Sequence, residues 1–512
     1  MIDATFIIPN NSAGIYQSLS NNFSAIETPT WALLLAQSCR SKGFKVSIID
    51  TLAENLSDQD TLNRIKETKP KNLVFVVYGQ NVNASTANMS GATRLSNFIK
   101  NNYDIRISYI GSHVQALPIQ TIKNEKSIDI VFTNEGVYAL QNLLKEDIDF
   151  REYNKINGIA YRDLHKKIKI NKPEKIVPQD KMDIDLPGYA WDLLPFKNKP
   201  FDLYRAPMWH AEYDSKNRTP YAAIQTSLGC QFGCNFCMIN IINRDDNEEI
   251  GVAGNYSGMR FWTPDFIIKE FEKLIEFGVY TIKITDEMFL LNPKYYKPLC
   301  EKLAEKNKED KFKIWAYSRI DTVKRPEILQ IVRKAGIKWL CLGIESGDKK
   351  VRLEVSKGKF EDVDVKTVVE KIHEADIDVL GNYIFGLPGD NLETMNKTLN
   401  LSKELCTSGW NAYAAMALPG SQLYKDAIDK KIRLPENYEG YSFHSYDTIP
   451  LPTEELPAYK ILDFRDKAYI DYHSSIPFQE RIRKRFGMKA VNSINDMLKI
   501  KLKRKIIEEN SI

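Results

Sequence analysis

The chain has 512 residues, of which 43% are hydrophobic and 27% are charged, and its formal net charge at pH 7 is +4. This length allows two or three folded domains, and the composition is that of an ordinary globular protein rather than a disordered one. The small net charge gives no reason to expect a nucleic acid as a partner.

Cysteine usage and the first residues of the chain indicate the compartment. Three of the seven cysteines lie in one short motif, and the other four, Cys39, Cys300, Cys341 and Cys406, are scattered. This distribution argues against a disulfide framework and for a reducing compartment. The N-terminal residues lack the basic and apolar regions of a signal peptide, and no apolar run is long enough to cross a bilayer. We therefore expect a cytoplasmic protein without a membrane span.

Residues 1–149 alternate short β-branched runs with amphipathic segments, from TFIIP near the start to IDIVFTN near the end. Strands that alternate with helices predict a doubly wound, Rossmann-like parallel sheet. Ligands of such sheets bind at the carboxyl ends of the strands. The loops at 9–12, 78–86 and 111–118 should therefore line one crevice, and their Gly, Asn and Ser residues allow a ligand to approach the backbone closely.

Residues 150–218 have a different character, with two short predicted strands, INGIAYRD and KKIKINK, and with several prolines and aromatic residues. Prolines at this density interrupt regular helices and strands. We interpret this segment as a linker that packs at the seam between two domains.

A group of three cysteines follows the linker. Cys230, Cys234 and Cys237 are separated by three and then two residues, and Gly229 and Gly233 permit a tightly wrapped loop. Thiolates at this spacing suit one iron–sulfur cluster in which the protein binds three irons and the fourth stays open to a substrate or cofactor. The alternative is a zinc knuckle. Zinc needs a fourth cysteine or histidine nearby, and none follows within the next thirty-odd residues.

The alternation of strand and helix resumes after the cysteines and continues to residue 431. It contains six strand–helix units, which predict an open six-stranded (β/α) barrel over residues 219–431 rather than a closed barrel of eight. Residues 432–512 should form a helical C-terminal region with a basic tail. This tail is either a solvated helix face or a surface that attracts an anionic substrate or lipid.

Candidate site residues, most of them polar, stand at the carboxyl ends of four predicted barrel strands. Active sites of such barrels lie at these ends. Each residue alone could be a salt bridge or a turn residue at the rim of the barrel. Four strand ends in register with the cysteine loop indicate a site. The residues are Asp286 and Glu287, Ser318 and Arg319, Glu345 and Ser346, and Ile384 to Gly386.

The cysteine spacing, with the aromatic Phe236 directly before the last cysteine, resembles the signature of the radical S-adenosylmethionine (SAM) family. The resemblance implies a 4Fe–4S cluster on the three cysteines, whose fourth iron binds the amino and carboxyl groups of SAM. It also implies cleavage of SAM to a 5′-deoxyadenosyl radical, with an electron from a donor such as flavodoxin or ferredoxin. The implied SAM contacts are Phe236, Asp286, Glu287, Ser318, Arg319, Glu345, Ser346, Ile384 and Gly386.

The N-terminal segment resembles the cobalamin (B12)-binding domain that precedes many radical SAM barrels. The resemblance lies in the loop at 78–80, the turn at 111–113 and the Asn-Glu-Gly at 134–136. The implied cobalamin contacts are Tyr78, Gly79, Gln80, Ser85, Gly111, Ser112, His113, Asn134, Glu135 and Gly136.

One feature of other cobalamin proteins is missing. Their Asp-x-His-x-x-Gly motif supplies an axial histidine, whereas the Asp-x-His at Asp163 to His165 lacks the glycine and lies beyond the domain, as does the one at Asp471 to His473. We therefore expect no protein imidazole on cobalt, and a structural role for His113. A flavodoxin-like sheet without a cofactor is the alternative for the whole segment.

Together these features resemble the B12-binding-domain radical SAM proteins, the group that includes the anaerobic magnesium-protoporphyrin monomethyl ester cyclase. The leading hypothesis is methylation of an unactivated carbon of a small biosynthetic intermediate, either anionic or neutral. Radical cyclisation, rearrangement or oxidation is the second hypothesis, and a binding protein with a vestigial barrel is the third. The substrate and the acid–base residues are not predicted by the sequence.

Overall fold

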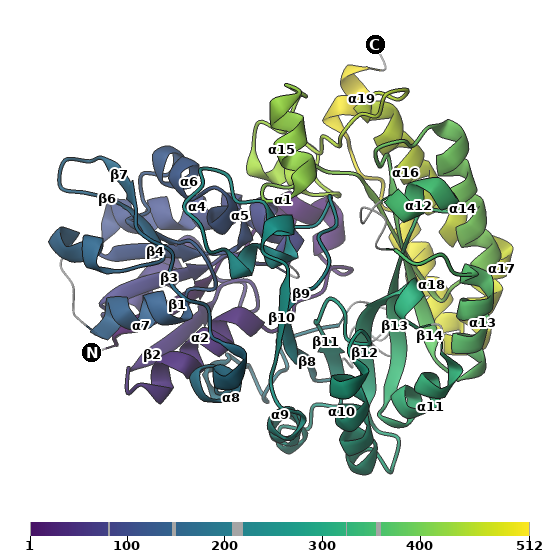
Figure 1. Cartoon of the computed structure of the whole chain (residues 1–512), viewed down its shortest axis with the longest axis horizontal. Coiled ribbons are helices and arrows are strands. Elements are labelled where there is room, and N and C mark those ends of the chain that lie inside the picture. Colours follow the sequence, from purple (N-terminus) through teal and green to yellow (C-terminus); the bar gives the residue numbers. More distant parts are fainter. Residues whose placement is uncertain are drawn as a thin grey trace.

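The computed structural model of the chain has two lobes, an N-terminal one that contains a twisted sheet and a C-terminal one that contains an open barrel (Figure 1). It describes residues 2–79, 82–145, 150–206, 219–323, 325–354 and 360–510. Within these residues, no helix combines the length and the hydropathy that crossing a bilayer demands.

The N-terminal sheet has seven strands in the order β2-β1-β3-β4-β5-β6-β7, and its first five strands are parallel. The strands are β1 (Ala4–Ile8), β2 (Val46–Asp50), β3 (Asn72–Val76), β4 (Arg106–Ile110), β5 (Ile130–Phe132), β6 (Ile159–Arg162) and β7 (Ile168–Ile170). The last two pair antiparallel, and they are the two short strands that the sequence placed in the linker. The structure thus extends the N-terminal sheet beyond residue 149.

Helices cover both faces of this sheet because neighbouring strand residues point to opposite sides. Phe6 and Val74 pack with the helices on one face, whereas Ile7 and Phe75 pack with those on the other. This arrangement confirms the predicted doubly wound sheet. The helices are α1 (Ser12–Tyr16), α2 (Thr30–Ser41), α3 (Asp58–Thr68), α4 (Ser85–Asn102), α5 (Ser112–Ala116), α6 (Pro118–Asn124) and α7 (Val137–Lys145).

The linker fastens the two lobes to each other. Its short helix α8 (Met182–Asp185) lies between them, and its aromatic side chains bond to both. Trp191 donates from Nε1 to Glu270 of the barrel lobe at 2.9 Å, and Tyr204 donates to Asp50 of the N-terminal sheet at 3.0 Å. Tyr204 and Trp191 are buried, so the seam is closed here.

The second lobe confirms the open barrel. Its six strands lie in the order β15-β14-β13-β12-β11-β8, and all are parallel. They are β8 (Tyr221–Ile224), β11 (Thr281–Ile284), β12 (Lys313–Arg319), β13 (Ile337–Glu345), β14 (Asp378–Phe385) and β15 (Gly409–Ala414). The covering helices are α9 (Pro264–Glu276), α10 (Pro293–Lys306), α11 (Pro326–Lys334), α12 (Lys349–Glu354), α13 (Val365–Glu374), α14 (Leu392–Leu405) and α15 (Gln422–Asp429).

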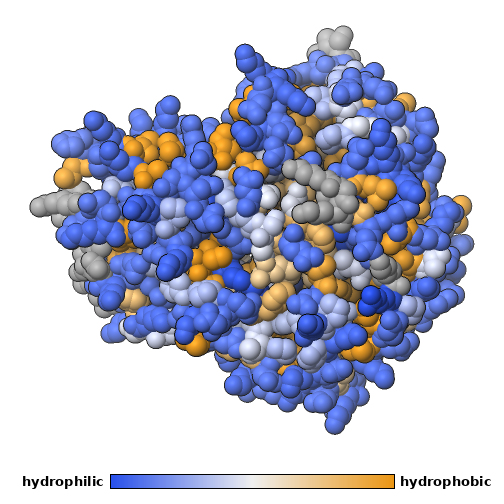
Figure 2. Space-filling view, in the orientation of Figure 1, coloured by the Kyte–Doolittle hydropathy of each residue, from blue (hydrophilic) through white to orange (hydrophobic). Residues whose placement is uncertain are grey.

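The C-terminal region is helical, as predicted, and packs on the barrel. It consists of α16 (Ala458–His473), α17 (Ile476–Phe486), α18 (Met488–Leu498) and α19 (Lys505–Glu509). Several of its basic residues are paired within the chain. Arg485 lies 2.8 Å from Asp378, and Arg504 lies 2.8 Å from Asp466. Figure 2 shows that hydrophilic residues cover most of the surface seen from this side, with hydrophobic groups near the boundary of the lobes.

An open barrel has two edge strands, and a different segment covers each of them. The hydroxyl of Thr28, which precedes α2, donates to the Ala223 carbonyl of β8 at 3.1 Å and accepts from the Ala223 N–H at 2.9 Å. At the other edge, Arg465 of α16 donates to the Ala412 carbonyl of β15 at 2.8 Å. The N-terminal and C-terminal parts of the chain therefore meet the barrel where its backbone groups lack strand partners.

Replacing Thr28 with Val should weaken the contact between the lobes. The change keeps the side-chain shape but leaves the buried N–H and C=O of Ala223 without the hydroxyl, which costs about 1–3 kcal/mol of unfolding free energy. Chemical denaturation of the full chain should show this loss, and Thr28→Ser, which retains the hydroxyl, should show much less. Equal stability of both variants would contradict the role of the hydroxyl.

Candidate active site

Cys230 ends β9 (Ser227–Cys230), and Cys234 and Cys237 lie on the loop that follows. Strand β9 forms a hairpin with β10 (Gly258–Phe261). The predicted strand AAIQTSLG is therefore two strands, β8 and β9. Gly229 has φ +78°, and a Cβ there would lie 2.3 Å from the Gly258 carbonyl oxygen, so the hairpin requires glycine at this position. The Cys237 N–H donates to the Cys234 carbonyl at 3.1 Å, which wraps the loop.

Asn240 fixes this loop, a role that sequence reasoning missed. Its Oδ1 accepts from the Cys230 N–H at 2.7 Å, and its Nδ2 donates to the Phe232 carbonyl at 2.9 Å. Asn240 is buried, and one amide thus holds both ends of the first turn of the loop. The sequence feature that could have indicated this role is the position of Asn240, three residues after the last cysteine.

The geometry of the cysteines fits an iron–sulfur cluster. All three cysteines are outside disulfide bonds and line one cavity. Nowhere in the described part of the chain do three His, Cys, Asp or Glu side chains converge on a single metal ion. A zinc knuckle needs such convergence, whereas each cysteine of a cluster binds a different iron. The residues present therefore fit the cluster better than zinc.

The cavity has a volume of about 880 Å³ and extends from the cysteine loop through the barrel to the C-terminal region. Six of the predicted SAM contacts line it. They are Phe236, Glu287, Ser318, Arg319, Glu345 and Ile384.

Three predicted SAM contacts lie outside this lining, each with other partners. Asp286 is buried and accepts 2.6 Å hydrogen bonds from the N–H and hydroxyl of Thr226 and from the Ser227 hydroxyl, which fixes the start of β9. The hydroxyl of Ser346 lies 3.2 Å from that of Thr398. Gly386 donates its N–H to Asp390. Through these hydrogen bonds, the three residues stabilise the ends of the strands.

Arg319, one of the implied SAM contacts, forms a two-pronged pair with the carboxylate of Asp321. Nε and Nη2 of Arg319 donate to the two oxygens of Asp321, both at 2.6 Å. The guanidinium lies 3.9 Å from the ring centroid of Phe232 in the cysteine loop and 4.5 Å from that of Phe360. Such a stacked and paired cation braces the cysteine loop against the end of β12.

Two glutamates near the cysteines have raised pKa values. Burial raises the pKa of Glu345 to about 7, although Arg319 opposes the shift. Burial also raises the pKa of Glu287 to about 7 against the opposing effect of Lys283. Glu345 has φ +65°, a left-handed conformation that is strained for a glutamate. Perturbed acids on a strained strand end, beside a cavity, are typical of functional sites.

The predicted cobalamin contacts fall into two groups. Tyr78 and Gly79 line the cavity, and Gln80 lies outside the described residues. The others, Ser85, Gly111, Ser112, His113, Asn134, Glu135 and Gly136, are buried behind the crevice and do not line it.

Contacts within the protein account for several residues of the second group. Nδ1 of His113 lies 3.1 Å from the Thr86 hydroxyl, and its ring meets that of Tyr438 edge-on at 5.2 Å. Glu135 pairs with Arg260 of the β9–β10 hairpin at 2.7 Å. These residues thus fasten the N-terminal sheet to the rest of the chain.

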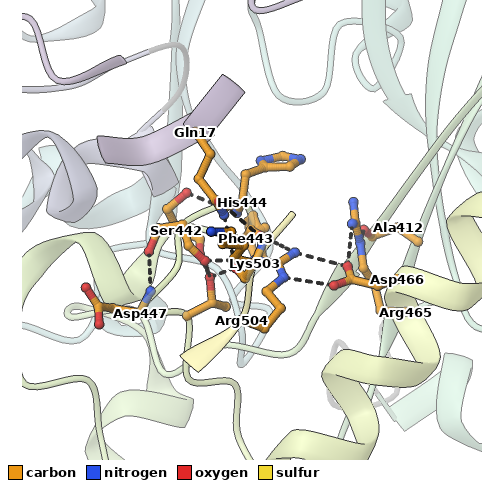
Figure 3. Close-up of polar contacts among 12 residues, drawn as sticks. Gln17, Ala412, Ser442, Phe443, His444, Asp447, Arg465, Asp466, Lys503 and Arg504 are labelled. Atoms are coloured by element: carbon orange, nitrogen blue, oxygen red, sulfur yellow. Dashed lines mark hydrogen bonds and ion pairs between the residues drawn. The ribbon is translucent and has the colours of Figure 1, made fainter. Parts of the chain in front are cut away.

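Sequence reasoning missed the segment from Ile15 to Trp31, which forms much of the cavity wall on the N-terminal side. At the outer wall of the cavity, this segment meets the C-terminal region (Figure 3). There Nε2 of Gln17 donates to the carbonyls of His444 at 2.6 Å and Lys503 at 3.2 Å. Arg504 donates to the Phe443 carbonyl and to Asp466.

Comparison with known proteins supports a radical SAM assignment. Residues 224–402 match the sequence model of the radical SAM superfamily. An uncharacterized methyltransferase of Pyrococcus horikoshii is 25% identical over 432 residues, which cover 84% of each chain. The anaerobic magnesium-protoporphyrin IX monomethyl ester cyclase of Cereibacter sphaeroides is 22% identical, and the match covers 83% of this chain and 63% of the cyclase.

A solved structure shares the whole architecture. It is that of the radical SAM methyltransferase TsrM of Kitasatospora setae with cobalamin and a 4Fe–4S cluster bound, at a TM-score of 0.63 and 13% identity. The superposition covers 92% of this chain and 88% of that one. This similarity shows that the two lobes and the C-terminal helices recur together as one fold.

Replacing Asn240 with Ala should weaken cluster binding. The variant leaves the buried Cys230 N–H without an acceptor, at a cost of about 1–3 kcal/mol to the folded loop. We expect less iron and sulfide per chain after anaerobic reconstitution, and faster loss of iron to a chelator. Asn255→Ala, which changes an exposed residue of the nearby turn Ala253–Asn255, serves as control. Unchanged iron retention in Asn240→Ala would show that the loop holds its shape without the amide.

Replacing Glu345 with Gln should change the pH dependence of stability. Its folded-state pKa of about 7 exceeds the ordinary 4.5, so the folded state binds a proton that the unfolded state has released. The free energy of unfolding should therefore fall as pH rises from about 4.5 to 7, and the variant should lose part of this fall. Thermal midpoints between pH 5 and 8 test this, with the exposed Glu301→Gln as control. Identical pH profiles for both variants would contradict the raised pKa.

Proposed function

Because this chain belongs to the radical SAM superfamily, we propose that it is a cobalamin-dependent radical SAM enzyme that methylates a carbon atom of a small molecule. The observation that carries the proposal is the cavity, which joins the cysteine loop to the crevice of the N-terminal sheet. A group bound in the crevice and SAM bound at the cluster would therefore face the same substrate.

In this proposal the barrel lobe binds the cluster and SAM, and the N-terminal lobe binds cobalamin. The cluster and SAM supply a 5′-deoxyadenosyl radical, and methylcobalamin supplies the methyl group. This chain's residues bind and orient these groups. Cys230, Cys234 and Cys237 hold the cluster, and Phe236 and Ile384 offer apolar contact for SAM. Glu345, half-buried beside the cavity, can accept hydrogen bonds from SAM hydroxyl or ammonium groups.

Cobalamin fits the crevice without a protein imidazole. Among the described residues that line the cavity from the N-terminal side, from Ile15 to Ala87, none is a histidine or cysteine. Trp31 and Tyr78 meet there with ring centroids 5.8 Å apart. Tyr78 also accepts a 2.7 Å hydrogen bond from Nε2 of Gln115, which fixes its hydroxyl. We propose that Trp31 and Tyr78 face the corrin ring.

Further parts of the proposal concern the partners and the compartment. A flavodoxin or ferredoxin would supply the electron for the cluster. None of the seven cysteines, all within the described residues, forms a disulfide bond, which suits a reducing cytoplasm. An anionic substrate, which the basic tail had suggested, is not part of the proposal, because Arg485 and Arg504 of that tail are paired with aspartates.

Cyclisation or another radical reaction without methyl transfer is the second candidate. It is favoured by the similarity to the cyclase of Cereibacter sphaeroides over 83% of this chain. The two candidates share the cluster and SAM chemistry and differ in whether a methyl group reaches the product.

The cofactor content of anaerobically purified protein tests the proposal. Protein made with cobalamin supplied should contain about four irons and one cobalamin per chain, and the Cys230/Cys234/Cys237→Ala variant should lose the iron but keep the cobalamin. Reduced protein should convert SAM to 5′-deoxyadenosine. Iron without cobalamin would leave a radical SAM enzyme and favour the second candidate. Absence of iron from the wild-type protein would refute both.

Electron paramagnetic resonance of bound cob(II)alamin tests the axial position separately. We expect no superhyperfine splitting from an axial nitrogen, and an identical spectrum for His113→Ala, because His113 bonds Thr86 and does not line the cavity. A nitrogen splitting that His113→Ala abolishes would place that imidazole on cobalt.

A further inference from the structure

We infer that the interior of the barrel holds an uncharged aromatic ring of the substrate, selected by the buried ion pair between Glu27 and Lys283. The inference rests on the proposed function, since it takes this cavity as the place where the substrate reacts. It adds a substrate class and two specificity-determining residues.

The ion pair crosses from one lobe to the other inside the cavity. Nζ of Lys283, on β11, lies 2.6 Å from Oε1 of Glu27, on the segment between η1 (Gln17–Ser20) and α2. The side chains are only 5% and 8% exposed, yet both line the cavity. The pair therefore joins the two lobes and also contacts the space that a substrate would occupy.

Aromatic rings surround the ammonium group of Lys283. Nζ lies 5.2 Å from the ring centroid of Trp315 and 5.3 Å from that of Tyr317, both on β12. Tyr413 of β15 and Tyr16 of α1 also line the cavity. These rings offer faces and edges against which another aromatic ring can stack.

An amide ladder completes the interior on neighbouring strands. Nδ2 of Asn411 lies 3.3 Å from Oδ1 of Asn382, whose own Nδ2 lies 3.0 Å from Sγ of Cys341. All three residues line the cavity. Together with the tyrosine hydroxyls, they offer a ring several hydrogen-bond donors and acceptors without a net charge.

The cations of the interior are paired, and burial raises the pKa values of the two other acids that line it, Glu287 and Glu345, to about 7, so that both are mostly uncharged at pH 6. Lys283 and Arg319 are the cations that line the barrel part of the cavity, and each has a carboxylate at 2.6 Å, from Glu27 and Asp321 respectively. A charged ring would lose its hydration there and meet no unpaired opposite charge. A neutral ring keeps the balance, stacks on Trp315 and Tyr317, and can accept a hydrogen bond from the lysine ammonium group, which has three donors.

Fragment binding to the full chain tests the inference without knowledge of the substrate. The probes are indole, benzoate and benzylammonium, with cyclohexylmethanol as an aliphatic comparison. Ligand-observed NMR titrations are run at pH 6, where Glu287 and Glu345 are mostly protonated, with excess S-adenosylhomocysteine, so that the SAM site is occupied. The variants are Glu27→Gln, Lys283→Met and the double variant, each checked for folding by its thermal midpoint.

Wild-type protein should bind indole about tenfold more tightly than either charged probe and more tightly than cyclohexylmethanol, since a desolvated charge without a partner costs at least 1.4 kcal/mol. Glu27→Gln frees the lysine charge and should gain benzoate binding by about tenfold. Lys283→Met frees the glutamate charge and should gain benzylammonium binding. The double variant removes both charges and should gain neither.

Several results would overturn the inference. They are equal binding of indole and benzoate to the wild type, tighter binding of cyclohexylmethanol, or a Glu27→Gln variant that folds and gains no benzoate binding. If a single variant fails to fold, the wild type and the double variant still decide, because both must prefer indole over the charged probes. The titrations need no cobalamin and no turnover, so their failure is distinguishable from failure of the proposed function.

Discussion

The unpaired edges of the six-stranded sheet are the constraint on which the molecule depends. A closed barrel of eight strands pairs every strand, whereas six parallel strands leave one backbone edge on β8 and another on β15. Buried N–H and C=O groups at such edges cost free energy unless another segment bonds to them. Thr28 meets this need at β8 and Arg465 at β15. Both lobes and the C-terminal helices are thereby tied to one sheet.

This covering also shapes the cavity. The segment that carries Thr28 to its edge carries Glu27 into the barrel, where it neutralises Lys283. The incomplete barrel thus leaves room for a large ligand, and the N-terminal lobe supplies one side of that room. A fold that closed its own sheet would exclude the second lobe from the reaction chamber. The open sheet and the sharing of one cavity by two lobes therefore have the same physical origin.

Local patterns in the sequence predicted much of this structure. The strand and helix alternation located both sheets, and the cysteine spacing located the loop that lines the cavity, because each depends on residues close together in the chain. Asp286 was expected at the cavity by its position at a strand end, but its bonds to Thr226 and Ser227 turn it inward. The contact between Glu27 and Lys283 joins residues 256 positions apart, and no local pattern encodes such a pair.

The outer wall of the cavity has a consequence for the modularity of the protein. Gln17 bonds to the backbone of Lys503, 486 positions away, so the wall is made jointly by segments that flank the whole catalytic barrel. Exchange of the N-terminal lobe for that of another family member would remove one half of the wall and leave the other half without its partner. Recombination between relatives is therefore constrained to transfer both flanking segments together, which ties their evolution to each other although the barrel lies between them.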